Sequence, residues 1–215
     1  MSTHPLSGLY GITDATLLPD TPTLLRACEA AIGGGMKLLQ YRDKSNPAAR
    51  RLEQATALRA LCHRHGCIFL INDDLELARA CHADGVHLGQ KDGSLTLARK
   101  RLGEAAIIGR TCHDRLELAL QAEAEGADYV AFGAFFPSRT KPGARRAPLA
   151  LLRAARARLR LPTVAIGGLS VDNAAEVIAA GADMIAVVHA LFAAPDIRAR
   201  AAQFSRLFPT HSRDH

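Results

Sequence analysis

Two aspartates stand where a metal ion could be bound. Asp73 and Asp92 each follow a short apolar run of the kind that forms a buried parallel strand. Parallel strands end at a common edge, so the two carboxylates are expected to converge. Mg²⁺ prefers oxygen ligands and uses few from the protein when it also binds phosphate groups. The arrangement therefore predicts a site for one magnesium ion.

A cationic stretch precedes these aspartates. Within residues 40–44 (sequence QYRDK), the side chains of Gln40, Arg42 and Lys44 fall on one face of an extended segment. Lys141, in a long loop later in the chain, adds a third cation. These charges could hold a diphosphate above the magnesium ion.

A separate phosphate pocket is predicted near the end of the chain. Gly167 and Gly168 follow one apolar run, and Val188-His189 follow the next. Bare glycine amides and a helix N-terminus favour an anion at such a place. Two phosphate sites imply two phosphorylated small-molecule substrates, and the expected reaction class is group transfer with diphosphate as the leaving group.

Each of these features also has a simpler interpretation. The run Asn72-Asp73-Asp74 could cap a helix, Arg42 and Lys44 could be surface charges, and the glycine pair could form a plain turn. The site interpretation is favoured because all the polar groups follow strands, whereas ordinary turn residues precede them.

Eight apolar runs alternate with eight amphipathic stretches, and caps support the boundaries. The predicted strands are Leu9–Thr13, Lys37–Tyr41, Ile68–Asn72, Gly85–Leu88, Ile107–Thr111, Tyr129–Gly133, Thr163–Ile166 and Met184–Val188. The predicted helices are Thr23–Ile32, Ala48–His65, Leu75–His82, Leu95–Leu102, Arg115–Glu125, Pro148–Leu159, Val171–Ala180 and Ile197–Leu207. Asp114 is expected to cap the fifth helix, and Asp172-Asn173 to open the seventh.

This alternation predicts an α/β fold, a single (β/α)8 TIM barrel domain over residues 1–215. Eight units in 215 residues give about 27 residues each, enough for a lean barrel. The alternative is an open doubly wound sheet, but no Gly-x-Gly-x-x-Gly follows the first strand.

Composition narrows the range of partners. The chain has 27 basic and 21 acidic residues, a net charge of +6, which suits phosphorylated ligands or nucleic acid. With no tryptophan and 5% aromatic residues, nucleic-acid binding is not expected, and Arg153–Arg160 is interpreted as a solvated helix face. No membrane span or secretory signal is seen, so we expect a cytoplasmic protein. A homo-oligomer is compatible with the sequence.

The five cysteines are expected to be reduced thiols. The stretch Cys62–Cys67 (sequence CHRHGC) has the residue types of a metal site. The favoured interpretation is a helix end followed by a strand, with Gly66 at the boundary and diverging side chains.

The motifs taken together resemble the thiamine-phosphate synthase family over almost the whole chain, in order. The segments that carry the resemblance are LYGITD (9–14), QYRDK (40–44), IND (71–73), DGVHLGQKD (84–92), FFPSRTK (135–141) and AIGG (165–168). The resemblance implies a barrel enzyme that joins 4-amino-2-methyl-5-(diphosphooxymethyl)pyrimidine to a thiazole phosphate. Its products would be thiamine phosphate and diphosphate.

The resemblance also implies roles for individual residues. The pyrimidine diphosphate contacts would be Gln40, Tyr41, Arg42, Asp43, Lys44, Asn72, Thr111 and Lys141, with Asp73 and Asp92 as magnesium ligands. The thiazole phosphate contacts would be Ser138, Arg139, Thr140, Gly168, Val188 and His189. Lys141, Arg42 and Thr111 would serve catalysis.

Three positions depart from the family pattern. Thr111 replaces serine and Ser138 replaces threonine, so both keep a hydroxyl, whereas His189 replaces a small residue. The His189 contact is therefore expected to come from its backbone.

The implied mechanism is dissociative, since no nucleophile–base pair is evident in the sequence. The long segment 134–146 is expected to act as a lid that carries Lys141. Alternatives are a relative of the thiazole tautomerase, against which Ala134 offers no basic side chain, and a non-catalytic barrel that binds a phosphorylated ligand.

Overall fold

Eight parallel strands close into a barrel in the computed structural model, which describes residues 6–137 and 145–209. The strands are β1 (Gly8–Ile12), β2 (Leu38–Tyr41), β3 (Ile68–Asn72), β4 (Gly85–Leu88), β5 (Ile107–His113), β6 (Tyr129–Gly133), β7 (Thr163–Ile166) and β8 (Met184–Val187). They pair in chain order, and β8 closes the barrel against β1. The predicted (β/α)8 barrel is confirmed, and closure excludes the open sheet.

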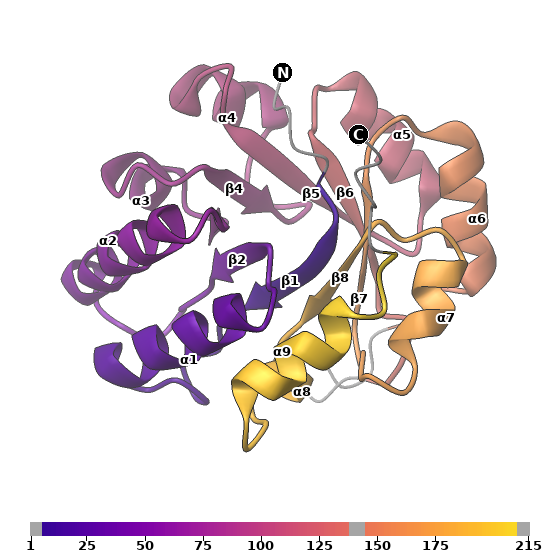
Figure 1. Cartoon of the computed structure of the whole chain (residues 1–215). Helices are drawn as coiled ribbons and strands as arrows, with labels where there is room; N and C mark the ends of the chain where they lie inside the picture. The colour runs from indigo at the N-terminus through magenta and orange to yellow at the C-terminus, as the bar shows by residue number, and fades with distance from the viewer. Residues whose placement is uncertain (1–5, 138–144, 210–215) are drawn as a thin grey trace, which may run out of the picture.

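Helices surround the strands, as Figure 1 shows. They are α1 (Thr21–Gly33), α2 (Ala48–Arg64), α3 (Leu75–Ala80), α4 (Leu95–Leu102), α5 (Leu116–Ala124), α6 (Leu149–Arg158), α7 (Ala174–Ala179), α8 (His189–Phe192) and α9 (Ile197–Ser205). The last helix, α9, packs on α1, so the outer layer closes as the sheet does. No helix in the described ranges is long and apolar enough to cross a membrane.

Side-chain caps begin several of the helices. Asp20 accepts a hydrogen bond from the Thr23 backbone N–H at 2.8 Å, and Asp196 accepts one from Ala199 at 2.9 Å. The predicted cap at Asp114 is wrong: Arg115 precedes α5, and Asp114 pairs instead with the Arg145 guanidinium at 3.0 Å. The partner comes from another loop, which no local pattern reveals.

Other predicted boundaries differ from those observed by one to three residues, and one helix was missed. The helix α7 begins at Ala174, after Asn173 has bonded to the Ser170 backbone N–H at 2.9 Å. The strand β5 continues to His113 with a bulge after Thr111. The short helix α8 was not predicted, because four residues cannot display a helical period.

Apolar side chains form one layer between the sheet and the helices and another inside the barrel. The interior layer is built from alternate residues of the strands: Tyr10, Ile12, Leu38, Leu70, Ile107, Tyr129, Ala131, Val164, Met184 and Ala186. Continuing the same period of two along and beyond the strands brings Arg42, Asn72, Thr111, Gly168 and Val188 to the mouth of the barrel.

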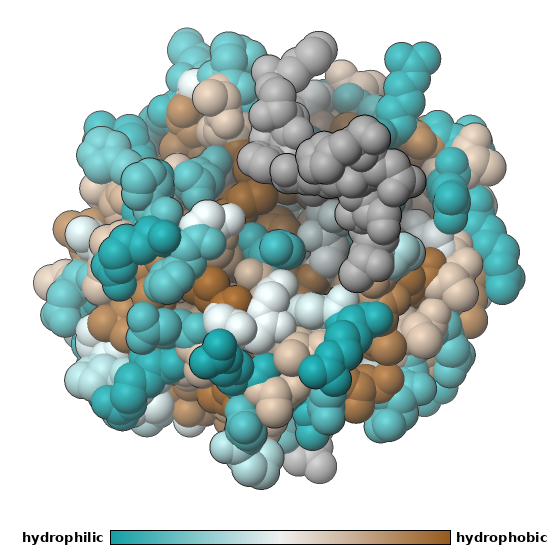
Figure 2. Space-filling model, viewed as in Figure 1, coloured by the Kyte–Doolittle hydropathy of each residue, from teal (hydrophilic) through white to brown (hydrophobic). Residues whose placement is uncertain are grey.

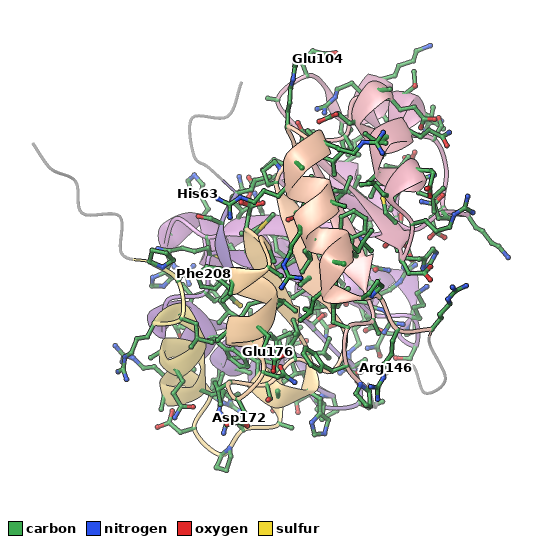
Figure 3. The ribbon with its side chains drawn as sticks, turned by 90° about the vertical axis from the view of Figure 1, so that its right-hand side faces the viewer. His63, Glu104, Arg146, Asp172, Glu176 and Phe208 are labelled. Carbon is green, nitrogen blue, oxygen red and sulfur yellow. The ribbon has the colours of Figure 1, made fainter. Side chains whose placement is uncertain are left out.

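The two ends of the barrel are distinguished by their loops. Arg146 and Asp172, in loops that follow strands, lie at one end in Figure 3, and Glu104, in a loop that precedes β5, lies at the other. Figure 2 shows hydrophilic residues over most of the outline of the molecule, with hydrophobic residues between them. The exposed arginines of α6 belong to this hydrophilic surface.

The cysteine stretch forms a helix end, as predicted. Cys62 and Cys67 are buried, whereas His63 and His65 are exposed. The pKa of the Cys62 thiol is raised by a hydrogen bond with Cys67 and by burial. Nowhere in residues 6–137 and 145–209 do three His, Cys, Asp or Glu side chains gather as a metal site would require.

Candidate functional site

A cleft of about 680 Å³ opens over the ends of β2, β3 and β4. It is lined by Asp43, Lys44, Asn46, Arg51, Asn72, Asp73, Asp74, Leu75, Glu76, Asp92, Leu97 and Arg101. Its wall carries both acidic and basic side chains. The cleft contains both predicted magnesium ligands and three of the predicted pyrimidine diphosphate contacts, Asp43, Lys44 and Asn72.

Asp73 is the centre of a small network of charged and polar groups. The Lys44 ammonium lies 3.1 Å from its Oδ2, and the Asn72 amide donates to the same atom at 2.7 Å. Partial burial acts to raise the pKa of Asp73, but hydrogen bonds with Lys44, Asp92 and Asn72 and the Lys44 charge hold it below its ordinary value. Asp73 is therefore an ionised carboxylate within hydrogen-bonding reach of Asp92.

The neighbouring Asp74 has a different task. Its carboxylate accepts from the Leu77 backbone N–H at 2.9 Å, which caps α3, and pairs with Arg51 at 3.1 Å. The capping interpretation thus applies to Asp74 and not to Asp73. With the cap supplied by the next residue, Asp73 takes a left-handed backbone conformation with φ of 62° and turns toward Lys44.

Asp92 is fixed by its own turn. Its Oδ2 accepts from the Gly89 backbone N–H at 3.1 Å. Arg110 supports the same loop by donating to the Gly89 and Gly93 carbonyls at 3.0 and 2.9 Å. Two carboxylates on supported loops fit Mg²⁺ that completes its coordination with phosphate oxygens and water, and they do not form an all-protein cage.

The turn that presents Lys44 is built by Asp43. Its Oδ1 accepts from the backbone N–H groups of Ser45 and Asn46 at 2.8 and 3.0 Å, and its Oδ2 accepts from the Asn46 side chain. Burial acts to raise the pKa of Asp43, but these hydrogen bonds outweigh it and lower the pKa to about 2. Asp43 is therefore a structural carboxylate of the site.

The ends of β1 and β2 are tied together below this turn. The Arg42 backbone N–H donates to Thr13 Oγ1 at 2.8 Å, and the Thr13 hydroxyl donates to the Arg42 carbonyl at 3.2 Å. Tyr41 points the other way, into the outer layer, and donates to Gln54 Oε1 at 2.7 Å. The backbone of residues 41 and 42 is thus held from both sides of the sheet.

A chain of hydrogen bonds crosses the barrel interior beneath the mouth. Gln40 Nε2 donates to the Tyr10 hydroxyl, which lies 2.9 Å from the Tyr129 hydroxyl. Tyr129 in turn lies 2.9 Å from His87 Nδ1, and His87 Nε2 lies 2.8 Å from Thr111 Oγ1. We call these five residues the interior chain. Its two ends, Gln40 and Thr111, are both predicted pyrimidine contacts.

The hydrogen bond between His87 and Thr111 was not predicted, and no nucleophile–base pair was expected from the sequence. The third member behind His87 is Tyr129, whose pKa is raised well above its ordinary value by burial and by Tyr10. A neutral phenol does not stabilise an imidazolium as a carboxylate would. The contact at His87 Nδ1 thus differs from the carboxylate contact of a catalytic triad.

The glycine pair after β7 forms a cradle against the loop after β6. Gly167 and Gly168 have φ values of 101° and 64°. A Cβ on Gly168 would lie 2.3 Å from the Pro137 carbonyl oxygen, and one on Gly167 would lie 2.4 Å from Ala134 Cβ. No other residue fits either position without displacing the backbone.

The backbone after β8 offers further donors to an anion. Val188 precedes α8, and the first amides of a helix have no acceptor within it. Val188 is half-buried and His189 is exposed. Because β7 and β8 are neighbours, these amides and the Gly168 cradle lie at the same part of the mouth.

Four predicted site residues lie outside the described residues: Ser138, Arg139, Thr140 and Lys141. The predicted lid from Ala134 to Arg146 is described only at its two ends. Sequence reasoning missed Tyr10, Tyr129 and His87 as part of the site. The available signal was a polar side chain at interior positions of three otherwise apolar strands.

The chain is similar to thiamine-phosphate synthases along nearly its whole length. The family model described as thiamine monophosphate synthase matches residues 9–191. A thiamine-phosphate synthase of Thioalkalivibrio sulfidiphilus is 57% identical over 207 residues, 94% of this chain and 96% of that protein. One from Thiobacillus denitrificans is 52% identical over 208 residues, 97% of each. The solved structure of a thiamine phosphate pyrophosphorylase from Pyrococcus furiosus matches with a TM-score of 0.84 and 36% identity, covering 93% and 94% of the two chains.

Replacing Asp43 by alanine should destabilise the protein in a pH-dependent way. The pKa of about 2 in the folded state lies below the ordinary 3.8, so the ionised group stabilises the fold above about pH 4. Allowing for solvent screening, we expect a loss of about 1–2 kcal/mol at pH 7, which is about halved at pH 3. Urea unfolding at both pH values measures it.

The matched control is Asp43→Asn, which keeps an acceptor oxygen and loses the charge. Its difference in unfolding free energy from the wild-type protein should shrink as the pH falls, because only the wild type loses a charge at this position. An unfolding difference that stays constant between pH 7 and pH 3 would show that the Asp43 charge contributes nothing to the turn.

Proposed function

The chain belongs to the thiamine-phosphate synthase family and is a transferase of thiamine biosynthesis, and we propose how its residues carry out that reaction. The substrates are 4-amino-2-methyl-5-(diphosphooxymethyl)pyrimidine and 4-methyl-5-(2-phosphooxyethyl)thiazole. The thiazole nitrogen replaces diphosphate on the pyrimidine methylene carbon, which gives thiamine phosphate and diphosphate. The observation that carries this assignment is the ionised Asp73 beside Asp92 and Lys44 at the mouth of a closed barrel.

The diphosphate of the first substrate is proposed to lie in the cleft over β2 to β4. Arg42 and Lys44 supply positive charge from one strand end, Asn72 supplies an amide, and Lys141 completes the set from the loop after β6. Lys44 reaches the cleft now through its ion pair with Asp73. Its ammonium can therefore neutralise charge on the departing diphosphate without a large movement.

Asp73 and Asp92 are the proposed ligands of one Mg²⁺ ion. The donor set fits this ion, because both groups are carboxylates and the cleft leaves room for phosphate oxygens. When bound, the ion supplies Lewis-acid stabilisation of negative charge on diphosphate oxygens. The residues of the chain hold the diphosphate so that its leaving oxygen faces these charges.

The proposed bond-breaking step is dissociative. The carbon–oxygen bond to diphosphate breaks first, and the pyrimidine methylene carries positive charge until the thiazole nitrogen attacks it. The Thr111 hydroxyl contacts His87, whose other ring nitrogen contacts a phenol, and the proposed step needs no covalent enzyme intermediate. Catalysis then depends on positioning and on charge stabilisation.

The thiazole phosphate is proposed to bind at the other side of the mouth. Gly168 and the backbone of Val188 and His189 supply amides, and Ser138, Arg139 and Thr140 supply donors from the loop after β6. The Phe136 backbone N–H donates to the Gly167 carbonyl at 3.0 Å, which ties this loop to the cradle. The tail of the thiazole is thus held while its ring reaches the pyrimidine.

The proposal also covers the domain organisation, the cellular location and the partners of the protein. We take the whole chain as one barrel domain that acts in the cytoplasm, with phosphorylated small molecules as partners and with no nucleic acid or membrane partner. Every residue assigned above comes from one chain, so the proposal is the same for a monomer and for a homo-oligomer.

The direct test is a coupled assay for diphosphate release. With both substrates and Mg²⁺ present, the protein should release one diphosphate for each thiamine phosphate formed. Omitting the thiazole phosphate, or chelating the metal, should abolish release. Product formation without diphosphate release would overturn the assignment, and so would full activity in excess chelator.

Asp73→Asn and Asp92→Asn should each raise the Mg²⁺ concentration for half-maximal rate by about tenfold or more, because a neutral amide is a weaker ligand for this hard cation. A magnesium titration of the steady-state rate measures it. The control is Asp74→Asn, which alters a cap of the same cleft and should leave the magnesium dependence unchanged. Unchanged dependence in both ligand variants contradicts the site.

His189→Ser should leave the Michaelis constant for the thiazole phosphate within about threefold of the wild-type value, because the proposed contact is a backbone amide. The exposure of the His189 side chain supports this expectation. Steady-state kinetics with varied thiazole phosphate provide the measurement. An increase of about a hundredfold would mean that the imidazole itself binds the phosphate.

Lys141→Ala should lower kcat by about 10²–10³, since negative charge grows on the diphosphate as it leaves. Ground-state binding of the pyrimidine substrate should change less than kcat. Single-turnover rates with both substrates saturating separate the two effects. Turnover near the wild-type rate would remove Lys141 from the catalytic set and leave the loop as a surface turn.

A further inference from the structure

The interior chain has a direction, and that direction is set by its first hydrogen bond. The Gln40 amide donates to the Tyr10 hydroxyl, so the Tyr10 oxygen is an acceptor there. The Tyr10 hydrogen must then be donated elsewhere, because Tyr10 is 1% exposed and a buried unpaired donor costs about 1–3 kcal/mol. The hydroxyl of Tyr129 lies 2.9 Å away and can accept it.

The remaining hydrogen bonds of the interior chain, as far as Thr111, take their direction from the first. Tyr129 accepts from Tyr10 and is 0% exposed, so its own hydrogen goes to His87 Nδ1. An imidazole that accepts at Nδ1 carries its proton on Nε2, which then donates to Thr111 Oγ1, 2.8 Å away. Burial raises the pKa of Tyr10 to about 12, so its hydroxyl keeps its proton at neutral pH.

The two ends of the chain therefore present opposite groups to the mouth of the barrel. Gln40 donates one amide hydrogen to Tyr10 inside, and its Oε1 makes no bond within the interior chain and can accept one at the mouth. Thr111 has accepted from His87, and its hydroxyl hydrogen remains to be donated. Reversing the chain would exchange both ends together, because each hydroxyl between them donates once and accepts once.

The arrangement of the strands holds the interior chain in place. Tyr10 and Tyr129 meet edge to face with ring centroids 6.1 Å apart, and Tyr129 stacks on the His87 ring at 5.5 Å. Gly109 makes room for Tyr129, since a Cβ there would lie 2.0 Å from its ring. The three rings thus fill the interior from β1, β6 and β4 and fix the distances of the chain.

We propose that Tyr10, Tyr129 and His87 are positioning residues that fix the donor and acceptor pattern offered to the pyrimidine ring. This inference rests on the proposed function. An aminopyrimidine edge carries an amino donor beside a ring-nitrogen acceptor, which matches an acceptor at Gln40 and a donor at Thr111. A 4-oxo ring carries an acceptor where the amino group stands. The interior chain therefore selects the 4-amino substrate over its 4-oxo analogue.

The test is the ratio of kcat/KM for the 4-amino pyrimidine diphosphate to that for its 4-oxo analogue, in wild-type protein and in Tyr129→Phe. The variant breaks the chain and frees Gln40 and Thr111 to turn. The ratio should fall by about tenfold or more, mainly through loss of activity on the amino substrate. The Michaelis constant for the thiazole phosphate should stay within about twofold.

Thr163→Val is the matched control, since it also removes one buried hydroxyl, which bonds to the Gly181 carbonyl at the opposite end of the barrel. It should lower stability and leave the ratio unchanged. If Tyr129→Phe does not fold, Tyr10→Phe breaks the same chain one link earlier. A ratio unchanged in the folded variant, or equal losses on both substrates, overturns the proposal.

A spectroscopic readout separates this inference from the proposed function. The ¹⁵N chemical shifts of His87, assigned with a His87→Gln variant, should show a bare Nδ1 and a protonated Nε2 in wild-type protein and a changed tautomer population in Tyr129→Phe. A protonated Nδ1 in the neutral ring overturns the chain direction, whether or not diphosphate is released. Absence of diphosphate release with the predicted tautomer overturns only the proposed function.

Discussion

Water has little access to the interior of the closed barrel, so the polar side chains that point into it must satisfy one another. Gln40, Tyr10, Tyr129 and His87 do so in a continuous row that surfaces at Thr111. Each link depends on strand register: β5 places Gly109 opposite Tyr129, and β4 places His87 opposite Gly109. The row cannot be rearranged without moving strands, which makes the floor of the site rigid.

The charged cleft lies on top of this rigid floor and is less constrained. Lys44 is mostly exposed and is held by one ion pair with Asp73, and Asp92 is held by its own turn. Such groups can exchange partners when a ligand brings phosphate oxygens and a cation. The rigid interior chain suits the pyrimidine ring, which must be oriented closely. The less constrained cleft suits the diphosphate, which is flexible and needs mainly positive charge.

Much of the fold could be predicted because local signals agree with the tertiary structure. The strands at 68–72, 85–88, 129–133 and 163–166 and the helix at 95–102 were predicted to the residue, since apolar runs there are bounded by polar, glycine or proline residues. Asp114 was misassigned because its partner, Arg145, arrives from a distant loop. The helix α8 is too short to have a period.

The site was predictable to a similar depth. Polar residues that follow strands could be gathered at one end of the barrel because parallel strands share their direction, and this led to Asp73, Asp92 and Gly168. The sequence could not show which of Asp73 and Asp74 caps α3, because that depends on which carboxylate reaches the Leu77 backbone N–H. The Tyr10–Tyr129 contact spans 119 residues and exists only after the barrel closes, so no local pattern contains it.

The central claim is that the mouth holds two phosphate groups at separate places and that the metal belongs to only one of them. Phosphorus NMR relaxation with Mn²⁺ in place of Mg²⁺, on protein saturated with thiamine phosphate and diphosphate, measures this directly. The account predicts strong paramagnetic relaxation of the diphosphate phosphorus nuclei, in contact with the ion, and much weaker relaxation of the thiamine phosphate nucleus. Equal relaxation of both, or relaxation of neither, would contradict it.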